Sequence, residues 1–492
     1  MTVLAPASVR PSGRVAVGAL ARAEARLLLR SPLLWAGMVL SLALYTAWGW
    51  TTMPTWDAFA QNAGMASLVL AGALLLAGHL AASRDRRAGA ESLETVPTTA
   101  ARRGLGLLAL VLVAGAAGAS GCLAGLLVML PAWPVGRFDP WALLVTVVVP
   151  AIGAALGIVV GRWLPTAAAG PLTVLAAAVV LGALPVLSTG ADTLVRHLFP
   201  VPDTPWVTGA ARPTGWHLVY LMCVLAAIVA LLRWRHFWII AIGVLPPAVA
   251  TGAFATDQQA RATPAVIYPE MVYAVAGPAV LHCETHGDVR YCALPHYGGW
   301  IPLWREAVEP VTRNLPAGAT RPTVRQLAGM DDGHVLVPEV PEIATWPRWG
   351  RHGHWAEHSR TQLTIDYTTA ATGLFGRGIT PFDEAARSGC SGAGQHRTVV
   401  ALWLLAQAVP DGTRHLADGG LNLGRVRYDR ADAQAAAALL ARPQDEVAAF
   451  LVAHWPQVMD PAGRALAPLG VTVQPPVIPA GGEPSDQPRI CR

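Results

Sequence analysis

The sequence predicts an α-helical polytopic membrane domain of about seven spans, followed by an extracytoplasmic α+β domain. Of the 492 residues, 53% are hydrophobic and 14% are charged, which is too apolar for a water-soluble enzyme of this size. The charge balance changes near residue 255: 16 arginines and 8 acidic residues precede that point, and 20 arginines and 23 acidic residues follow it. We therefore expect a cytoplasmic interfacial elbow helix (1–30), a transmembrane domain (31–255) and an extracytoplasmic α+β domain (256–492).

The basic side chains are all arginines, because the chain contains no lysine. A Walker A loop needs a lysine that reaches the β- and γ-phosphates, so this chain cannot bind ATP in that way. Schiff-base catalysis through lysine is excluded as well. The excess of arginine belongs to the membrane half, where it reflects orientation in the bilayer, so we expect no nucleic-acid partner.

Seven apolar stretches are the candidates for spans, since about 20 apolar residues in a helix cross the hydrocarbon core. They are residues 32–50, 63–82, 105–130, 141–161, 166–187, 217–232 and 237–255. The sixth is short and the last contains two prolines, so these two are the weakest of the seven.

The first 30 residues do not read as a secretory signal, because arginines are spread through them and no small-residue cleavage site follows a short apolar core. Arg22, Arg26 and Arg30 are spaced by four and share one helix face. This pattern favours an interfacial helix on the membrane lipid, and the alternative is a solvated lead-in to the first span.

Arginine placement predicts the orientation. With seven spans and a cytoplasmic N-terminus, 13 arginines lie inside and 3 lie in outside loops. The inside set comprises Arg10, Arg14, Arg22, Arg26, Arg30, Arg84, Arg86, Arg87, Arg102, Arg103, Arg162, Arg233 and Arg235. The positive-inside rule therefore favours a multi-pass plasma-membrane protein whose C-terminal domain is extracytoplasmic.

Four cysteines give an independent indication of the same orientation. A two-residue turn at Gly287–Asp288 would place Cys283 opposite Cys292 in a β-hairpin, within disulfide range. Cys390 and Cys491 remain as candidates for a second, long-range pair. Disulfides form outside the cytoplasm, which agrees with the charge count.

The second half shows strand-like alternation over 266–300 and helical patterns over 303–309, 396–408 and 431–454, the last broken at Pro443. Residues 321–347 and 475–488 are Pro-rich and read as a connector and a tail.

The loop 83–104, which reads SRDRRAGAESLETVPTTAARRG, is the most informative segment. Its part from Arg84 to Pro97 resembles the first intracellular loop of exporter-type ATP-binding-cassette (ABC) permeases from actinobacteria. Residues 24–32 are similar to the elbow helix of the same family. The resemblance implies a coupling helix that docks in a groove of a separate ATPase subunit.

On this resemblance, the residues expected at the ATPase contact are Arg87, Glu91, Leu93 and Glu94. It also implies a homo- or heterodimer of permease subunits, no cofactor in this chain, and ATP bound by the partner. That family usually has six spans per subunit. A seventh span with an external domain is similar to a subgroup whose extracytoplasmic domain resembles gluzincin aminopeptidases, often in degenerate form.

A gluzincin carries His-Glu-x-x-His on a helix, and this sequence has no such motif. The nearest pattern is the inverted one, His-x-x-Glu-His, at His354, Glu357 and His358. A polar surface cluster is the favoured interpretation, so no metal site is expected. Two other functions stay open beside the permease: a membrane-anchored zinc hydrolase using these three residues, and a membrane-anchored sensor or assembly protein.

Overall fold

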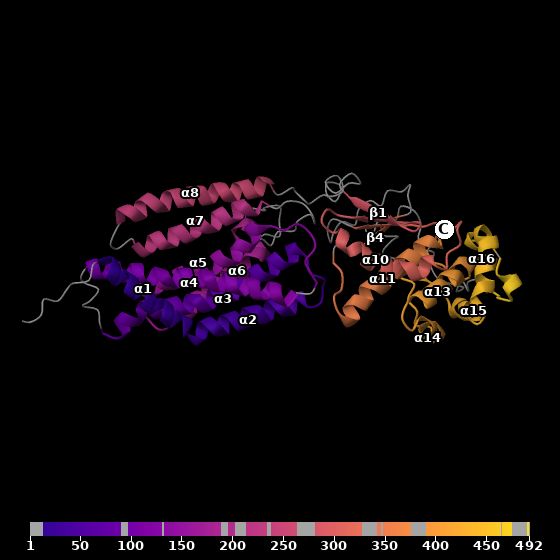
Figure 1. Ribbon diagram of the computed structural model, residues 1–492, viewed down its shortest axis with the longest axis horizontal. Coiled ribbons are helices and arrows are strands. Elements are labelled where there is room, and N and C mark those ends of the chain that lie inside the picture. Colours follow the sequence, from indigo (N-terminus) through magenta and orange to yellow (C-terminus); the bar gives the residue numbers. More distant parts are fainter. Residues whose placement is uncertain are drawn as a thin grey trace, which may run out of the picture.

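The computed structural model is mostly helical and falls into a helical bundle and a C-terminal α+β domain (Figure 1). It describes residues 13–89, 97–129, 132–187, 195–201, 213–233, 238–262, 281–326, 342–345, 348–374, 390–463, 465–474 and 490–491.

Long helices occupy all seven predicted stretches of the first half. In chain order the elements are α1 (Gly13–Leu29), α2 (Pro32–Gly49), α3 (Trp56–Arg87), α4 (Pro97–Met129), α5 (Pro140–Trp163), α6 (Ala169–Leu187), the 3-10 turn η2 (Val195–Leu198), α7 (Thr214–Arg233) and α8 (Trp238–Ala262).

Five segments are long and apolar enough to cross a membrane within the part of the chain that the structure describes. They are Pro32–Gly49, Trp56–Arg87, Arg102–Met129, Pro140–Trp163 and Thr214–Leu232. Ala169–Leu184 in α6 is apolar but shorter. The multi-span helical character is therefore confirmed, and the count of seven stays a prediction.

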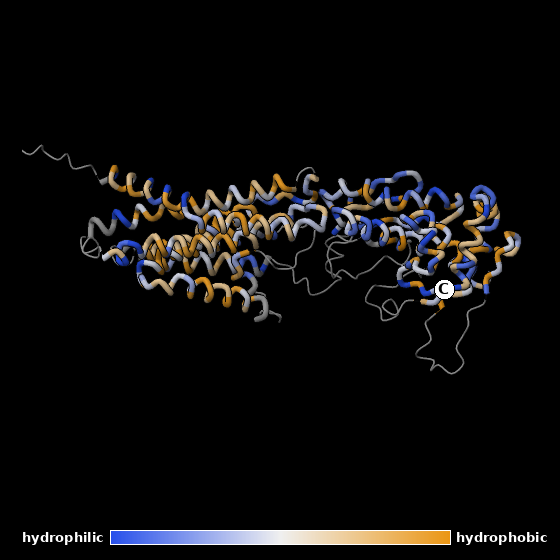
Figure 2. Tube along the Cα trace, turned by 90° about the horizontal axis from the view of Figure 1, so that it is seen from below, coloured by the Kyte–Doolittle hydropathy of each residue, from blue (hydrophilic) through white to orange (hydrophobic). Residues whose placement is uncertain are grey.

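Small residues let α3 and α5 pack closely in the centre of the bundle. A Cβ atom on Gly157 would lie 2.1 Å from the Leu75 carbonyl oxygen, and one on Gly153 would lie 2.3 Å from that of Ala71. Backbones approach in this way when membrane helices associate through packing rather than through the hydrophobic effect. Figure 2 shows that hydrophobic residues dominate the helical bundle, whereas hydrophilic and hydrophobic residues are mixed in the C-terminal domain.

The C-terminal domain contains a four-stranded mixed sheet in the order β1-β2-β3-β4. The strands are β1 (His282–His286), β2 (Val289–Ala293), β3 (Thr323–Gln326) and β4 (Glu342–Thr345). β1 and β2 are antiparallel, and the other two pairs are parallel. A second, small sheet pairs β5 (Cys390–Ser391) with β6 (Val426–Arg427).

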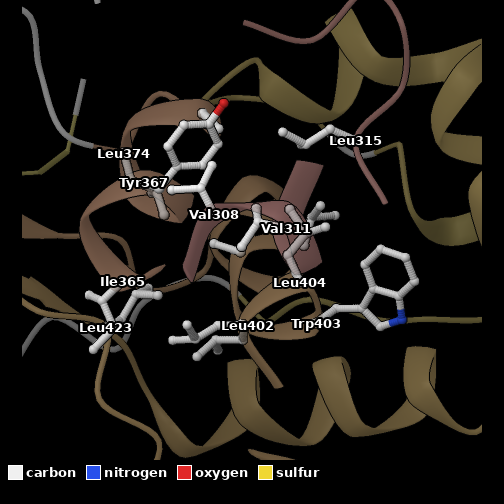
Figure 3. Packing of buried hydrophobic residues seen from close by; sticks show 14 of the residues in the cluster. Val308, Val311, Leu315, Ile365, Tyr367, Leu374, Leu402, Trp403, Leu404 and Leu423 are labelled. Carbon is white, nitrogen blue, oxygen red and sulfur yellow. The ribbon is translucent and has the colours of Figure 1, made fainter. Parts of the chain in front are cut away.

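The helices of this domain are α10 (Ile301–Thr312), α11 (Gly353–Ala371), α13 (His396–Ala408), α14 (Gly412–Ala417), α15 (Arg430–Leu440) and α16 (Gln444–Met459). The core lies between α10, α11 and α13, where Val308, Ile365, Leu402 and Leu404 pack together (Figure 3). The three predicted helices are confirmed, including the break at Pro443 between α15 and α16.

The predicted hairpin and both cysteine pairs are confirmed. Cys283 lies opposite Cys292 across the Gly287 turn, with Cα atoms 4.0 Å apart and a disulfide between them. The second disulfide joins Cys390 to Cys491, whose Cα atoms are 5.1 Å apart.

Two interpretations of the second half were wrong in part. Residues 321–347 are not only a connector, because they contain β3 and β4. The alternating stretch 266–300 contributes β1 and β2 but ends in the 3-10 turn Gly298–Trp300, and residues 263–280 lie outside the described residues.

The C-terminal domain is joined to the bundle through backbone hydrogen bonds at the ends of α2, α3, α4 and α5. Thr52 forms an antiparallel bridge with Gly350, and Met53 N–H donates to the Trp349 carbonyl oxygen at 2.6 Å. On the neighbouring loop, Gly136 N–H donates to the His296 carbonyl oxygen at 2.9 Å. These contacts define the domain-facing end of the bundle.

Arg351 strengthens this junction electrostatically. Its guanidinium donates to the carbonyl oxygen of Met129, the last residue of α4, at 2.7 Å. The C-terminal carbonyls of a helix carry partial negative charge, so a cation there is favourable. The C-terminal domain is therefore bound directly to the ends of the bundle helices by backbone and Arg351 hydrogen bonds.

Candidate functional site

A cluster of ion pairs lies at the end of the bundle away from the C-terminal domain. α3 runs for 32 residues, about 48 Å, from the junction to Arg87, and α4 begins at Pro97 beside that end. Both helices exceed the hydrocarbon thickness of about 30 Å. Their charged ends meet α1, and the cluster comprises Glu24 of α1, Arg84 and Asp85 of α3, and Arg103 of α4.

Arg103 is the centre of the cluster. Its Nε donates to Asp85 Oδ2 at 2.8 Å, and its Nη1 donates to Glu24 Oε1. Arg84 Nη2 reaches Glu24 Oε2 at 3.4 Å. Glu24 is only 3% exposed, so its charge is buried between two guanidinium groups. The pairs join α1, α3 and α4 at the root of the loop that connects α3 with α4.

Close backbone packing places Glu24 in the cluster. A Cβ atom on Gly106 of α4 would lie 3.0 Å from Leu20 Cβ, so α1 crosses α4 where a glycine leaves room. Leu28 of α1 is buried in the same apolar cluster as Leu107 and Leu110 of α4. α1 is therefore packed against the bundle, and Glu24 faces inward as a result.

Of the predicted elbow arginines, Arg22 and Arg26 lie on the face of α1 opposite Glu24, and Arg30 directly follows the helix. Arg22, Arg26 and Arg30 are exposed, and Arg22 Nε donates to the Gly18 carbonyl oxygen at 3.2 Å. Their contact with lipid stays a prediction.

Of the four predicted ATPase contacts, the structure describes only Arg87, the last residue of α3. Arg87 is exposed and donates to the Leu80 carbonyl oxygen at 3.0 Å, at the C-terminal end of α3. Glu91, Leu93 and Glu94 lie outside the described residues. Arg84 and Asp85 of the ion-pair cluster therefore lie in the same last turn of α3 as Arg87.

The inverted zinc pattern falls on the first two turns of α11. His354, Glu357 and His358 are all exposed, and the two imidazole ring centres are 6.2 Å apart. Nowhere in the described residues do three or more His, Cys, Asp or Glu side chains form a group that could hold a metal ion.

A second exposed polar cluster occurs on β1. His282 and His286 each donate from Nε2 to one oxygen of Glu284, at 3.1 and 3.0 Å. The hydrogen bonds from His286 and His282 lower the pKa of the Glu284 carboxyl. The three side chains of β1 thus satisfy one another's hydrogen bonds.

Sequence reasoning missed Glu24, and a signal for it was present. Glu24 is the only acidic residue among the first 56, within a helix whose other charges are arginines. A lone carboxylate in such a helix is costly next to lipid unless it is paired, so it should have been matched with Arg84 or Arg103.

Comparisons with protein-family models, curated protein sequences and solved structures gave no match to this chain.

Proposed function

We propose that this chain is the membrane subunit of an ABC exporter, driven by a separate ATPase that binds at the loop between α3 and α4. The residues that would contact the ATPase are Arg87, Glu91, Leu93 and Glu94. The proposal rests on the sequence resemblance of residues 84–97 and 24–32 and on the ion-pair cluster behind the loop.

The cluster is the observation that carries the proposal. A coupling segment must transmit a displacement to the transmembrane helices, so the helix ends that carry the loop must be held rigidly together. Buried charge pairs provide one, because separating Glu24 from Arg103 would leave an unpaired charge out of water. A push on the loop would therefore move α1, α3 and α4 as a unit.

Exposed tryptophans support the placement in a membrane. Trp35 and Trp163 lie near the cluster end of α2 and α5. Trp48 and Trp141 lie at the other end of the same helices. Tryptophan is enriched at both membrane–water interfaces. The two tryptophans of α5 are about 33 Å apart along the helix, which matches a hydrocarbon core of about 30 Å, whereas those of α2 are about 20 Å apart.

The arginine distribution and the disulfides support the orientation. The cluster end carries the exposed arginines of α1 and α3, as a cytoplasmic surface does. The domain at the other end holds two disulfides, which persist in an oxidising compartment. We therefore propose seven spans, a cytoplasmic N-terminus and an extracytoplasmic C-terminal domain, with ATP bound only by the partner and with two permease subunits, identical or paralogous, in the exporter.

Co-purification tests the proposal. The chain is expressed with a tag in its native host, and the complex recovered through the tag is examined for a Walker-A-containing subunit. Reversal of Glu91 and Glu94 to arginine should abolish recovery of the ATPase, because these carboxylates would no longer suit its groove. The control is Asp418→Arg, an exposed charge reversal at the C-terminal end of α14, which should leave recovery unchanged. Recovery of the ATPase with the double variant would contradict the proposed contact.

A further inference from the structure

A basic and aromatic patch lies at the junction between the end of α2 and the C-terminal domain. It consists of Trp50, Arg348, His352, His354, Trp355 and His358. All six side chains are exposed, and Trp355 is 52% exposed. Within residues 348–358 the only acidic residue is Glu357. An exposed surface of this composition suits a partner that is both anionic and amphipathic.

The backbone fixes the height of the patch above the bilayer. Trp50 directly follows Gly49, the last residue of α2, and the His352 ring centre is 5.0 Å from that of Trp50. Arg351 N–H donates to the Thr51 carbonyl oxygen at 3.0 Å. One or two residues beyond a span correspond to the headgroup layer, which extends roughly 5–8 Å from the hydrocarbon. The patch therefore lies at headgroup level if α2 spans the membrane.

Residues 348–352 keep this position because Gly350 has no side chain. A Cβ atom on Gly350 would lie 1.9 Å from the Trp355 carbonyl oxygen, so residues 348–352 fold back onto the first turn of α11. Gly350 N–H also donates to Ser359 Oγ at 2.8 Å. In Figure 1 α11 lies on the side of the domain that faces the bundle.

We infer that this patch binds the phosphate groups of anionic phospholipids in the leaflet next to the C-terminal domain. Arginine and histidine nitrogens donate hydrogen bonds to phosphate oxygens, and tryptophan rings sit among headgroups with one edge apolar and one edge polar. This assigns the three histidines a role in contact with lipid rather than in holding zinc. It depends on the bundle lying in a membrane and not on the ATPase partner, so the two proposals fail separately.

Hydrogen exchange of the full-length chain in lipid nanodiscs tests the inference. Nanodiscs are made from phosphatidylcholine alone or from phosphatidylcholine mixed with phosphatidylglycerol. In the anionic discs, amides of residues 348–358 should exchange about five-fold more slowly, the effect of one basic residue near an anionic surface. High salt should remove the difference, because it screens the attraction.

Two variants complete the test. Replacement of Arg348, His352, His354 and His358 by glutamine should abolish the lipid-dependent slowing while leaving the exchange of α13 in the core unchanged. The control replaces Arg414, His415 and His454, which are exposed on α14 and α16, and should keep the slowing.

Equal exchange in the two kinds of disc would overturn the inference. It would also be overturned if slowing appeared in phosphatidylcholine alone on addition of zinc, since the histidines would then form a metal site. Slowing that survives the fourfold replacement would equally contradict it.

Discussion

The two disulfides should contribute unequally to the stability of the C-terminal domain, because they close loops of very different length. Cys283 and Cys292 are 9 residues apart, whereas Cys390 and Cys491 are 101 apart. The loss of chain entropy on closing each loop corresponds to about 2.5 kcal/mol for the short one and about 5 kcal/mol for the long one. Replacing each pair by serine therefore separates the two contributions.

The long-range pair carries further interactions that its removal would weaken. The Cys491 carbonyl oxygen accepts hydrogen bonds from Gln395 Nε2 and Arg397 Nη2, and Cys491 N–H donates to the Ser391 carbonyl oxygen. Burial lowers the pKa of the Arg397 guanidinium, so a lost hydrogen bond there is costly. We therefore expect the Cys390→Ser, Cys491→Ser variant to lose about 5 kcal/mol, at the upper end of what removal of a disulfide costs.

Proteolysis of the heated full-length chain measures the effect. At about 2–4 °C per kcal/mol for a domain of this size, the unfolding temperature should fall by about 10–20 °C without the long-range disulfide. Removal of the hairpin disulfide should lower it by about half as much. Equal losses for both variants, or a larger loss for the hairpin pair, would refute the loop-length reasoning.

Three further substitutions have defined outcomes. Burial raises the pKa of the Asp366 carboxyl to about 7 from an ordinary value near 3.8. The folded chain therefore keeps a proton that the unfolded chain releases, and stability falls as the pH rises from 4 to 7. Asp366→Asn should remove this pH-dependent loss of stability, so the variant should be more stable than the original chain by at most about 4 kcal/mol above pH 7 and equally stable below pH 4. Thermal unfolding measured at a series of pH values tests this. Glu24→Gln should lower the free energy of unfolding of the bundle in detergent by about 3 kcal/mol, because Arg103 loses its buried partner. Glu306→Gln removes an exposed ion pair and should lower the free energy of unfolding by less than about 1 kcal/mol. Equal effects of the two substitutions would show that the buried cluster does not stabilise the bundle. Gly350→Ala should separate the C-terminal domain from the bundle and speed amide exchange at Met53 and Arg351, and unchanged exchange there would contradict the junction.

The hairpin was predictable because its information is local. The Gly287 turn and the period of two along a strand fix Cys283 opposite Cys292, so residue types within ten positions determine the register. Apolar length alone likewise located the helices of the bundle.

The strands β3 and β4 were not predictable in this way. Each has only four residues, and the strands with which they pair in parallel are distant in the sequence. The residues of β3 and β4 alone therefore do not indicate which strand each one pairs with. α11 was missed for another reason. Thr364, Thr368 and Thr372 lie in or next to it, and threonine is a poor helix former; here each hydroxyl donates to the carbonyl oxygen four residues earlier.

The ion-pair cluster could not be predicted from hydropathy either. α3 continues past its apolar stretch through Arg84 and Asp85 to Arg87, and charged residues beyond a span carry no apolar signal. Only the close crossing of α1 and α4 at Gly106 brings Glu24 to Arg103, and that crossing depends on three-dimensional packing.

The most direct test of the account is whether the two ends of the bundle face opposite sides of the membrane. Single cysteines are introduced in place of Arg87, at the cluster end, and of Asp418, in the C-terminal domain, and intact cells are treated with a membrane-impermeant maleimide. If the α3–α4 loop is cytoplasmic and the C-terminal domain extracytoplasmic, the cysteine at position 418 is labelled in intact cells and the cysteine at position 87 only after permeabilisation. Labelling of both from outside, or of position 87 alone, would contradict both the ATPase contact and the extracytoplasmic placement of the C-terminal domain.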